Sequence, residues 1–109
     1  MEEVFRGQER RRHRVFFTLN SEYHVRDGRV VAVRGRASGR WVEGHAAIGM
    51  EVRGHVEPDG LVPKLGDPRP GQRLYLARAG LSHDIVTSAV VSIGRPAQEI
   101  VATYPPIAA

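Results

Sequence analysis

Cysteine is absent from all 109 residues of the chain. Its absence excludes disulfide bonds, thiolate metal sites and a cysteine nucleophile together. Small secreted domains more often carry disulfides, so the sequence favours a reducing, cytoplasmic location. The chain also lacks a run of about 18 apolar residues, which a membrane-spanning helix needs. Its N-terminus has no apolar core after the charges, unlike a secretory signal peptide. We therefore expect a cytoplasmic protein that makes no contact with a membrane.

Lysine is nearly absent as well, since Lys64 is the only one and arginine supplies the rest of the positive charge. The net charge is +4 and the isoelectric point about 10.3. A basic balance suits a polyanionic partner such as nucleic acid. Codon bias in a GC-rich bacterial genome also favours arginine over lysine, and a charge of this size is ordinary for a small soluble domain. Codon bias explains the clustering of Arg10, Arg11, Arg12 and Arg14 less well.

A convergent set of catalytic residues is also missing. Ser82, His83 and Asp84 have the residue types of a catalytic triad, but adjacent residues in an extended chain point to opposite faces. The five histidines form no HxH, HxxxH or HxxE pair that would place two metal ligands on one face. We therefore expect a non-enzymatic protein that holds no metal and no cofactor.

What the sequence does contain is a repeated pattern of short strands. Its apolar residues mostly alternate with polar ones or form short β-branched runs, with a turn signal every eight to twelve residues. This spacing predicts an all-β single domain, a small barrel or sandwich of six to seven short antiparallel strands, SH3-like or similar. We expect a basic, flexible N-terminal segment over 1–12, the β domain over 13–104 and a short tail over 105–109.

Particular stretches predict particular elements. The pair Asp27–Gly28 predicts a hairpin turn. "DIVTSAVVSI" is the longest β-branched run and predicts a central, well-buried strand, with "EIVATY" pairing back onto it as a hairpin. At most one helical turn is expected, over Gly44–Glu51. Further strands are expected in "HRVFFTL", "RVVAVR", "RWV", "GMEVRGHV" and "QRLYLA".

The stretch "RRRHRVFF" is either a phosphate-binding surface or a solvated lead-in to the first strand. Guanidinium groups bind phosphate through paired hydrogen bonds and stack on planar rings. A basic arm ahead of a small barrel can lie along a nucleic-acid backbone, while exposed aromatic rings stack on bases. Phe17 faces outward if Phe16 faces inward, and Trp41 follows Arg40 as either a stacking platform or a core residue. The candidate binding residues are Arg10, Arg11, Arg12, Arg14, Phe17 and Trp41.

The spacing of Arg10 and Arg14 resembles the RxxxR segment at the entrance of PilZ domains, small β-barrels that bind cyclic diguanylate. The resemblance implies that these two arginines wrap the phosphates and guanine of a cyclic dinucleotide. It covers only this short segment. The second motif of that family is an Asp or Asn followed by SxxG, whereas Asn20 here is followed at once by Ser21 and no glycine stands at the required place.

Three functions therefore stay open. A protein-interaction or assembly module comes first, because a short all-β domain exposes sheet edges that pair with a protein partner or with a second copy. A nucleic-acid binder using the arginine cluster comes second, and a cyclic-dinucleotide receptor third.

Overall fold

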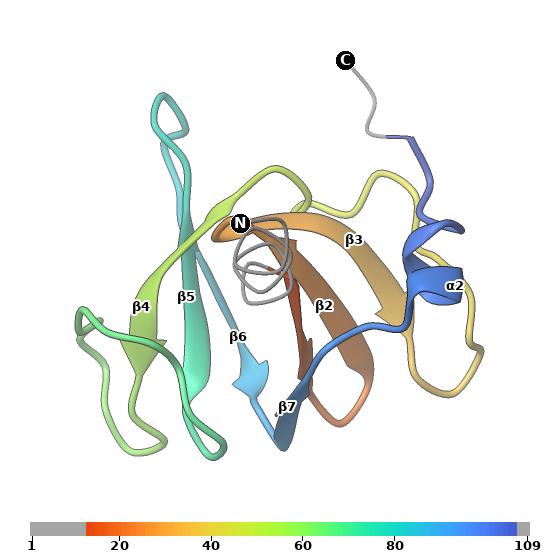
Figure 1. Cartoon of the computed structure of the whole chain (residues 1–109). Helices are drawn as coiled ribbons and strands as arrows, with labels where there is room; N and C mark the ends of the chain where they lie inside the picture. The colour runs from red at the N-terminus through yellow and green to blue at the C-terminus, as the bar shows by residue number, and fades with distance from the viewer. Residues whose placement is uncertain (1–12, 107–109) are drawn as a thin grey trace, which may run out of the picture.

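The computed structural model describes residues 13–106, which form one antiparallel sheet of seven short strands and one short helix (Figure 1). The order of the strands in the sheet is β6-β5-β4-β3-β2-β1-β7. The prediction of an all-β domain with six to seven short antiparallel strands is confirmed. The elements are β1 (His13–Phe17), β2 (Ser21–Arg26), β3 (Arg29–Gly35), β4 (Glu51–Val56), β5 (Arg73–Ala77), β6 (Ile85–Ala89), β7 (Ser92–Gly94) and α2 (Gln98–Val101).

The hairpin between β2 and β3 forms at the predicted place. Asp27 has a φ of 52° and Gly28 a φ of 76°, so both central residues of this tight turn adopt the left-handed region. Two positive φ values match the right-handed twist of the flanking strands, which is why Asp-Gly is favoured at such turns. The confirmed turn sets the register of β2 on β3, with Arg26 opposite Arg29.

The sheet folds into two halves because its central pairing is short. β3 and β4 pair only at Arg29 and Glu51, and the connection over 36–50 runs from the end of β3 back to Glu51, opposite the start of β3. One half contains β7, β1, β2 and β3, and the other contains β4, β5 and β6 (Figure 1).

The two outer strands of the sheet lie close together along the chain. Only Val90 and Val91 separate β6 from β7, although the two strands stand at opposite ends of the order. The Val90 N–H donates to the Gln72 carbonyl at 2.8 Å, and the Val91 N–H to the Phe17 carbonyl at 2.7 Å. The strands β6 and β7 do not pair with each other, so the sheet is not closed and a barrel is not confirmed.

The prediction of one central strand over "DIVTSAVVSI" is wrong. The run is divided between β6 and β7, and each of these lies at an end of the strand order. The chain bends at Val90, which is buried, and Val91, which is exposed, so that β6 pairs with β5 and β7 with β1. β-Branched composition favours extended backbone but does not encode such a bend.

The prediction of a strand over "EIVATY" is also wrong. "EIVATY" does not pair back as a strand, because Gln98–Val101 forms α2, with Ala97 extended just before it and Glu99 in its first turn. Residues 44–50 form turns, which is consistent with the expectation of at most one helical turn there, and Glu51 begins β4. In the predicted strand "RWV", only Trp41 forms a β-bridge, and its partner is Arg34. Tertiary packing overrides local propensity in all of these short segments.

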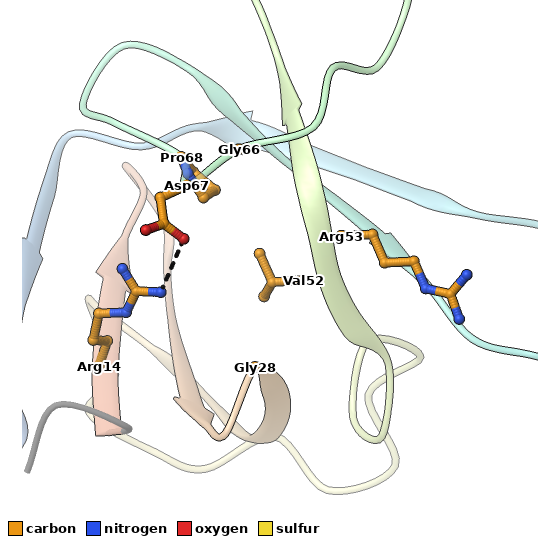
Figure 2. A pocket seen from close by; sticks show the side chains of 7 residues that line it. All are labelled: Arg14, Gly28, Val52, Arg53, Gly66, Asp67 and Pro68. Atoms are coloured by element: carbon orange, nitrogen blue, oxygen red, sulfur yellow. Dashed lines mark hydrogen bonds and ion pairs between the residues drawn. The ribbon is translucent and has the colours of Figure 1, made fainter. Parts of the chain in front are cut away.

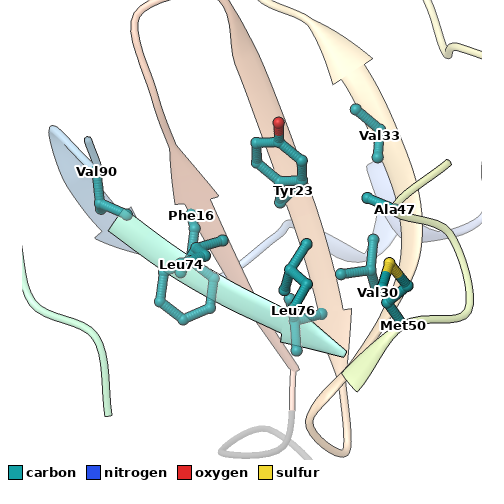
Figure 3. Close-up of a cluster of buried hydrophobic side chains, with 10 residues drawn as sticks. Phe16, Tyr23, Val30, Val33, Ala47, Met50, Leu74, Leu76 and Val90 are labelled. Atoms are coloured by element: carbon teal, nitrogen blue, oxygen red, sulfur yellow. The ribbon is translucent and has the colours of Figure 1, made fainter. Parts of the chain in front are cut away.

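A hydrophobic core fills the space between the two halves (Figure 3). Alternate residues of each strand point inward, and the turns before β4 cover one side of the core. Complete burial of a Val, Leu, Phe or Met side chain in this core stabilises the fold by about 1.5–3 kcal/mol. The buried cluster consists of Phe16, Tyr23, Val25, Val30, Val33, Ala47, Met50, Leu74, Leu76 and Val90.

β2 is buried on both faces, unlike a strand of a two-layer sheet with one solvated face. Tyr23 and Val25 face the core, whereas Glu22 and His24 face the other way and are also buried. The segment around α2 covers this outer face (Figure 1). A charged carboxyl and an imidazole are therefore enclosed outside the main core.

No helix within residues 13–106 is long and apolar enough to cross a membrane.

Candidate functional site

The predicted phosphate-binding cluster falls largely outside the described chain. Arg10, Arg11 and Arg12 precede residue 13, where the description begins. Arg14 is described, and its Nη2 lies 3.4 Å from Oδ1 of Asp67. Arg14 and Asp67 line a cleft of ≈ 390 Å³ between β1 and the β4–β5 loop. Figure 2 shows the ion pair between them, with Arg53 pointing away from it. Arg14 therefore meets a carboxylate of its own chain.

Phe17 is half-buried at the other end of β1. Because Arg14 and Phe17 are three residues apart on a strand, they project from opposite faces. The guanidinium of Arg36 lies over the Phe17 ring, 5.6 Å from its centre, and donates from Nη1 to the Thr18 carbonyl at 2.8 Å. One face of this ring is thus already stacked on an arginine.

Trp41 is half-buried and packed among other aromatic rings. Its ring centre lies 4.9 Å from that of His24 and 5.1 Å from that of Tyr104, both edge to face, and Arg34 stacks on it. Its Nε1–H donates to the Thr103 hydroxyl at 3.1 Å. The structure therefore does not bring Arg14, Phe17 and Trp41 to one surface. Whether any of them binds nucleic acid or a cyclic dinucleotide stays a prediction.

A buried polar network joins β1 and β2 to the C-terminal segment. Glu22 is an acceptor only, so its Oε1, 3.2 Å from Nε2 of His24, places the proton on that nitrogen. Nδ1 of His24 then accepts from the Tyr104 hydroxyl at 2.7 Å, and the same hydroxyl accepts from Nε2 of His13 at 2.9 Å. Arg34 donates to Glu22 from Nε at 3.2 Å. Every partner in this chain of hydrogen bonds has a consistent role with both histidines neutral.

Burial keeps these groups in their neutral forms. It lowers the pKa of His24 against the opposing effect of Glu22, and it lowers the pKa of His13. It raises the pKa of the Tyr104 phenol, which makes that hydroxyl a poor nucleophile. Neither the cleft beside Arg14 nor the larger one beside β3 is lined by these side chains. The network therefore has the properties of a clamp that holds α2 on the sheet.

The sequence SHD adopts no triad geometry. The Asp84 carboxylate accepts a hydrogen bond from the Tyr75 hydroxyl rather than from His83. Within residues 13–106, no group of three or more metal-ligating side chains comes together.

The loop between β4 and β5 exposes an apolar cluster that the strand-based interpretation did not identify. We call residues 57–72 the Leu61 loop. Leu61 is 95% exposed, Val62 72% and Leu65 91%. A signal was present in the sequence, because these residues stand between Gly60 and Gly66 among prolines and cannot be part of a buried strand.

The Leu61 loop is hydrogen-bonded to β4. Backbone hydrogen bonds run both ways between His55 and Lys64, at 3.0 and 2.9 Å, and Nδ1 of His55 lies 3.2 Å from the Gly66 carbonyl oxygen. Gly54 permits this contact, since a Cβ there would lie 2.1 Å from the Lys64 carbonyl oxygen. Pro58, Pro63, Pro68 and Pro70 restrict the backbone further. The apolar side chains are therefore presented on an ordered support.

In comparisons with known proteins, no family model matches the chain, and no curated protein or solved structure matches it either.

Proposed function

We propose that the protein is a non-enzymatic assembly module that pairs with a second copy of itself through the Leu61 loop. The observation that supports it is the exposure of Leu61, Val62 and Leu65 on one short, hydrogen-bonded segment. Large apolar side chains exposed singly are common, but three within five residues are a feature of contact surfaces. Burying them against another chain removes apolar area from water, which is the main driving force for association.

The order of the loop lowers the cost of that contact. Binding normally costs free energy because side chains and loops lose conformational freedom. Here the backbone is already held by the His55–Lys64 pairing and by prolines. The apolar side chains can therefore serve as anchors without first ordering the chain.

The charges on the Leu61 loop favour a second copy of the chain over a partner whose surface carries charge of only one sign. Asp59 precedes the apolar residues, Lys64 stands between Val62 and Leu65, and neither forms an ion pair within residues 13–106. Where two loops pass antiparallel about a two-fold axis between Leu61 and Val62, Asp59 of each copy faces Lys64 of the other. A two-fold contact must be self-complementary, and this arrangement of opposite charges fulfils that requirement.

A single loop supplies a small interface, so we expect a weak, reversible dimer with a dissociation constant on the order of 100 µM. Sedimentation velocity over a concentration series measures it directly. Leu61→Ser with Leu65→Ser should abolish the dimer. The matched control is Leu19→Ser, since Leu19 is 75% exposed on the turn between β1 and β2 and should leave the dimer unchanged.

A charge-reversal series tests the two-fold arrangement itself. Asp59→Lys alone and Lys64→Asp alone each place like charges opposite one another and should weaken the dimer several-fold. The double variant restores opposite charges and should recover the original affinity. A protein that stays monomeric to about 1 mM, or a dimer that survives loss of both leucines, would contradict the proposal.

A further inference from the structure

A second, larger cleft of ≈ 600 Å³ opens beside the start of β3. Its lining comes from β3, from the connection over 43–49 and from the described C-terminal end of the chain. That end of the chain lies at the upper right in Figure 1. The Leu61 loop lies at the lower left of the same view and contributes no residue to the cleft. Small-molecule sites in proteins commonly have volumes of about 300–1,000 Å³, so this cleft has the size of a ligand site.

One side of the cleft is apolar. Val31 on β3 and Ile48 on the connection are only partly buried, and Ile48 packs against the core from this side. Pro105 and Pro106 add two rigid rings from the C-terminal segment. Flat, rigid surfaces of this kind suit a planar apolar body rather than a flexible polar chain.

The lining of the cleft also includes an unpaired cation. Arg78, at the end of β5, forms no ion pair and no side-chain hydrogen bond within residues 13–106. Gly49 has a φ of +90°, and a Cβ there would lie 3.3 Å from Nη1 of Arg78. The guanidinium therefore lies close against the backbone of the connection, where a side chain at position 49 would crowd it.

A second arginine, Arg29, also lines the cleft, and some of its hydrogen-bond donors are already used. Nη2 of Arg29 lies 3.5 Å from Glu51, and Glu51 is also paired with Arg53 at 3.3 Å. One carboxylate thus serves two arginines, which leaves a positive excess here. Glu43 is the acidic residue among those that line the cleft. Its charge repels a dianion more strongly than a monoanion, because Coulomb energy scales with the product of charges.

His45 adds a neutral donor to the lining. Its Nδ1 accepts the Ala47 N–H at 3.0 Å, which leaves the proton of the neutral ring on Nε2. Burial lowers the pKa of His45, and the edge-to-face contact with Tyr23 fixes its ring. The cleft therefore offers an uncharged N–H beside its two guanidinium groups.

We propose that this cleft binds a small aromatic carboxylate. Arg78, with Arg29 beside it, holds the carboxylate group, since guanidinium forks bind carboxylates through paired hydrogen bonds. The aromatic body rests on Val31 and Ile48. A monoanionic carboxylate fits better than a phosphate monoester because of Glu43. This site shares no residue with the loop proposed for assembly, so the two proposals stand or fall separately.

Titration of the whole protein with 1-naphthoate, followed by amide and methyl NMR shifts, tests the proposal. Saturable shifts should appear at Val31, Ile48 and Gly49. Arg78→Gln should weaken binding by about tenfold or more, the effect of losing a charge-assisted pair. Glu43→Gln should strengthen binding several-fold by removing the repelling carboxylate.

The matched control is Arg73→Gln, because Arg73 is exposed at the start of β5, whereas Arg78 follows the end of that strand, and this change should leave affinity unchanged. Naphthyl phosphate and the neutral naphthalenemethanol should both bind more weakly than 1-naphthoate. Equal binding of the neutral alcohol, equal loss in Arg73→Gln, or the absence of shifts at these residues up to millimolar ligand would each overturn the proposal.

Discussion

The hydroxyl of Tyr104 lies 2.7 Å from Nδ1 of His24, a residue 80 positions earlier in the chain. This hydrogen bond attaches the segment after α2 to the outer face of β2. The same hydroxyl also accepts from His13 on β1, so one phenol joins three parts of the fold. Glu22 and Arg34 complete the network at its inner end.

Tyr104→Phe should destabilise the fold by about 2 kcal/mol. The change removes the phenolic oxygen and leaves Nδ1 of buried His24 without its donor, and an unsatisfied buried acceptor costs about 1–3 kcal/mol. Urea unfolding at neutral pH measures the loss. Tyr75→Phe serves as the control, since that hydroxyl bonds the exposed Asp84 and should matter far less. Equal stability of the two variants would show that the clamp contributes nothing.

The fold should lose stability as the pH falls below 6.5. Burial lowers the pKa of His24, of His13 and of His45 from 6.5, so the unfolded chain binds more protons than the folded one in that range. The stability that depends on these neutral rings is complete above pH 6.5 and is lost as the pH passes down through the lowered pKa values. His24 faces Glu22, which opposes this effect, and Arg34, which adds to it.

Urea midpoints measured across this pH range check the prediction. A midpoint that is flat from neutral pH to pH 5 would contradict it. His83→Gln is the control, because His83 is exposed and its replacement should leave the slope unchanged.

The sequence predicts the strands well where residues alternate over a local hairpin, as around Asp27–Gly28. It fails where the backbone bends between partners that lie far apart in the chain. Val90 and Val91 are both of a residue type common in strand interiors. At these two residues, however, the chain passes from pairing with β5 to pairing with β1. Gln98–Val101 becomes helical, and Tyr104 just after it contacts His24 on β2, a contact that no local pattern encodes.

The candidate site shows the same limit. The arginine cluster can be recognised in the sequence. Arg14, the member of it that the structure describes, nevertheless pairs with Asp67, 53 residues away. Trp41 could be expected in the core or on the surface, and it is neither, because Tyr104 and His24 enclose it only in part. The Leu61 loop could have been found from apolar residues set among prolines and glycines, since such a segment has no way to bury them.

Gly54→Ala should destabilise the protein by about 3 kcal/mol, at the upper end of the cost of overpacking. The new Cβ would lie 2.1 Å from the Lys64 carbonyl oxygen, a backbone atom, so the Leu61 loop must move away from β4. Thermal unfolding measures the loss. Gly94→Ala is the matched control, because its Cβ would meet Phe17 at an ordinary 3.6 Å and should change stability by less than about 1 kcal/mol. A tolerated Gly54→Ala would show that the loop is not held as described.

Under the nucleic-acid hypothesis, Arg14 must leave Asp67 before it can bind a phosphate. Asp67→Ala frees this arginine and removes a carboxylate that repels the backbone of the ligand, so it should strengthen binding several-fold. Arg14→Ala should weaken binding and reduce the salt slope by about one. Fluorescence anisotropy of a labelled random-sequence oligonucleotide, at low and near-physiological salt, measures both effects. Arg73→Gln is the control for total charge. If the protein binds no oligonucleotide even at low salt, the hypothesis fails for Arg10, Arg11, Arg12 and Arg14 together. If Arg73→Gln weakens binding as much as Arg14→Ala, the affinity reflects net charge and not this cluster.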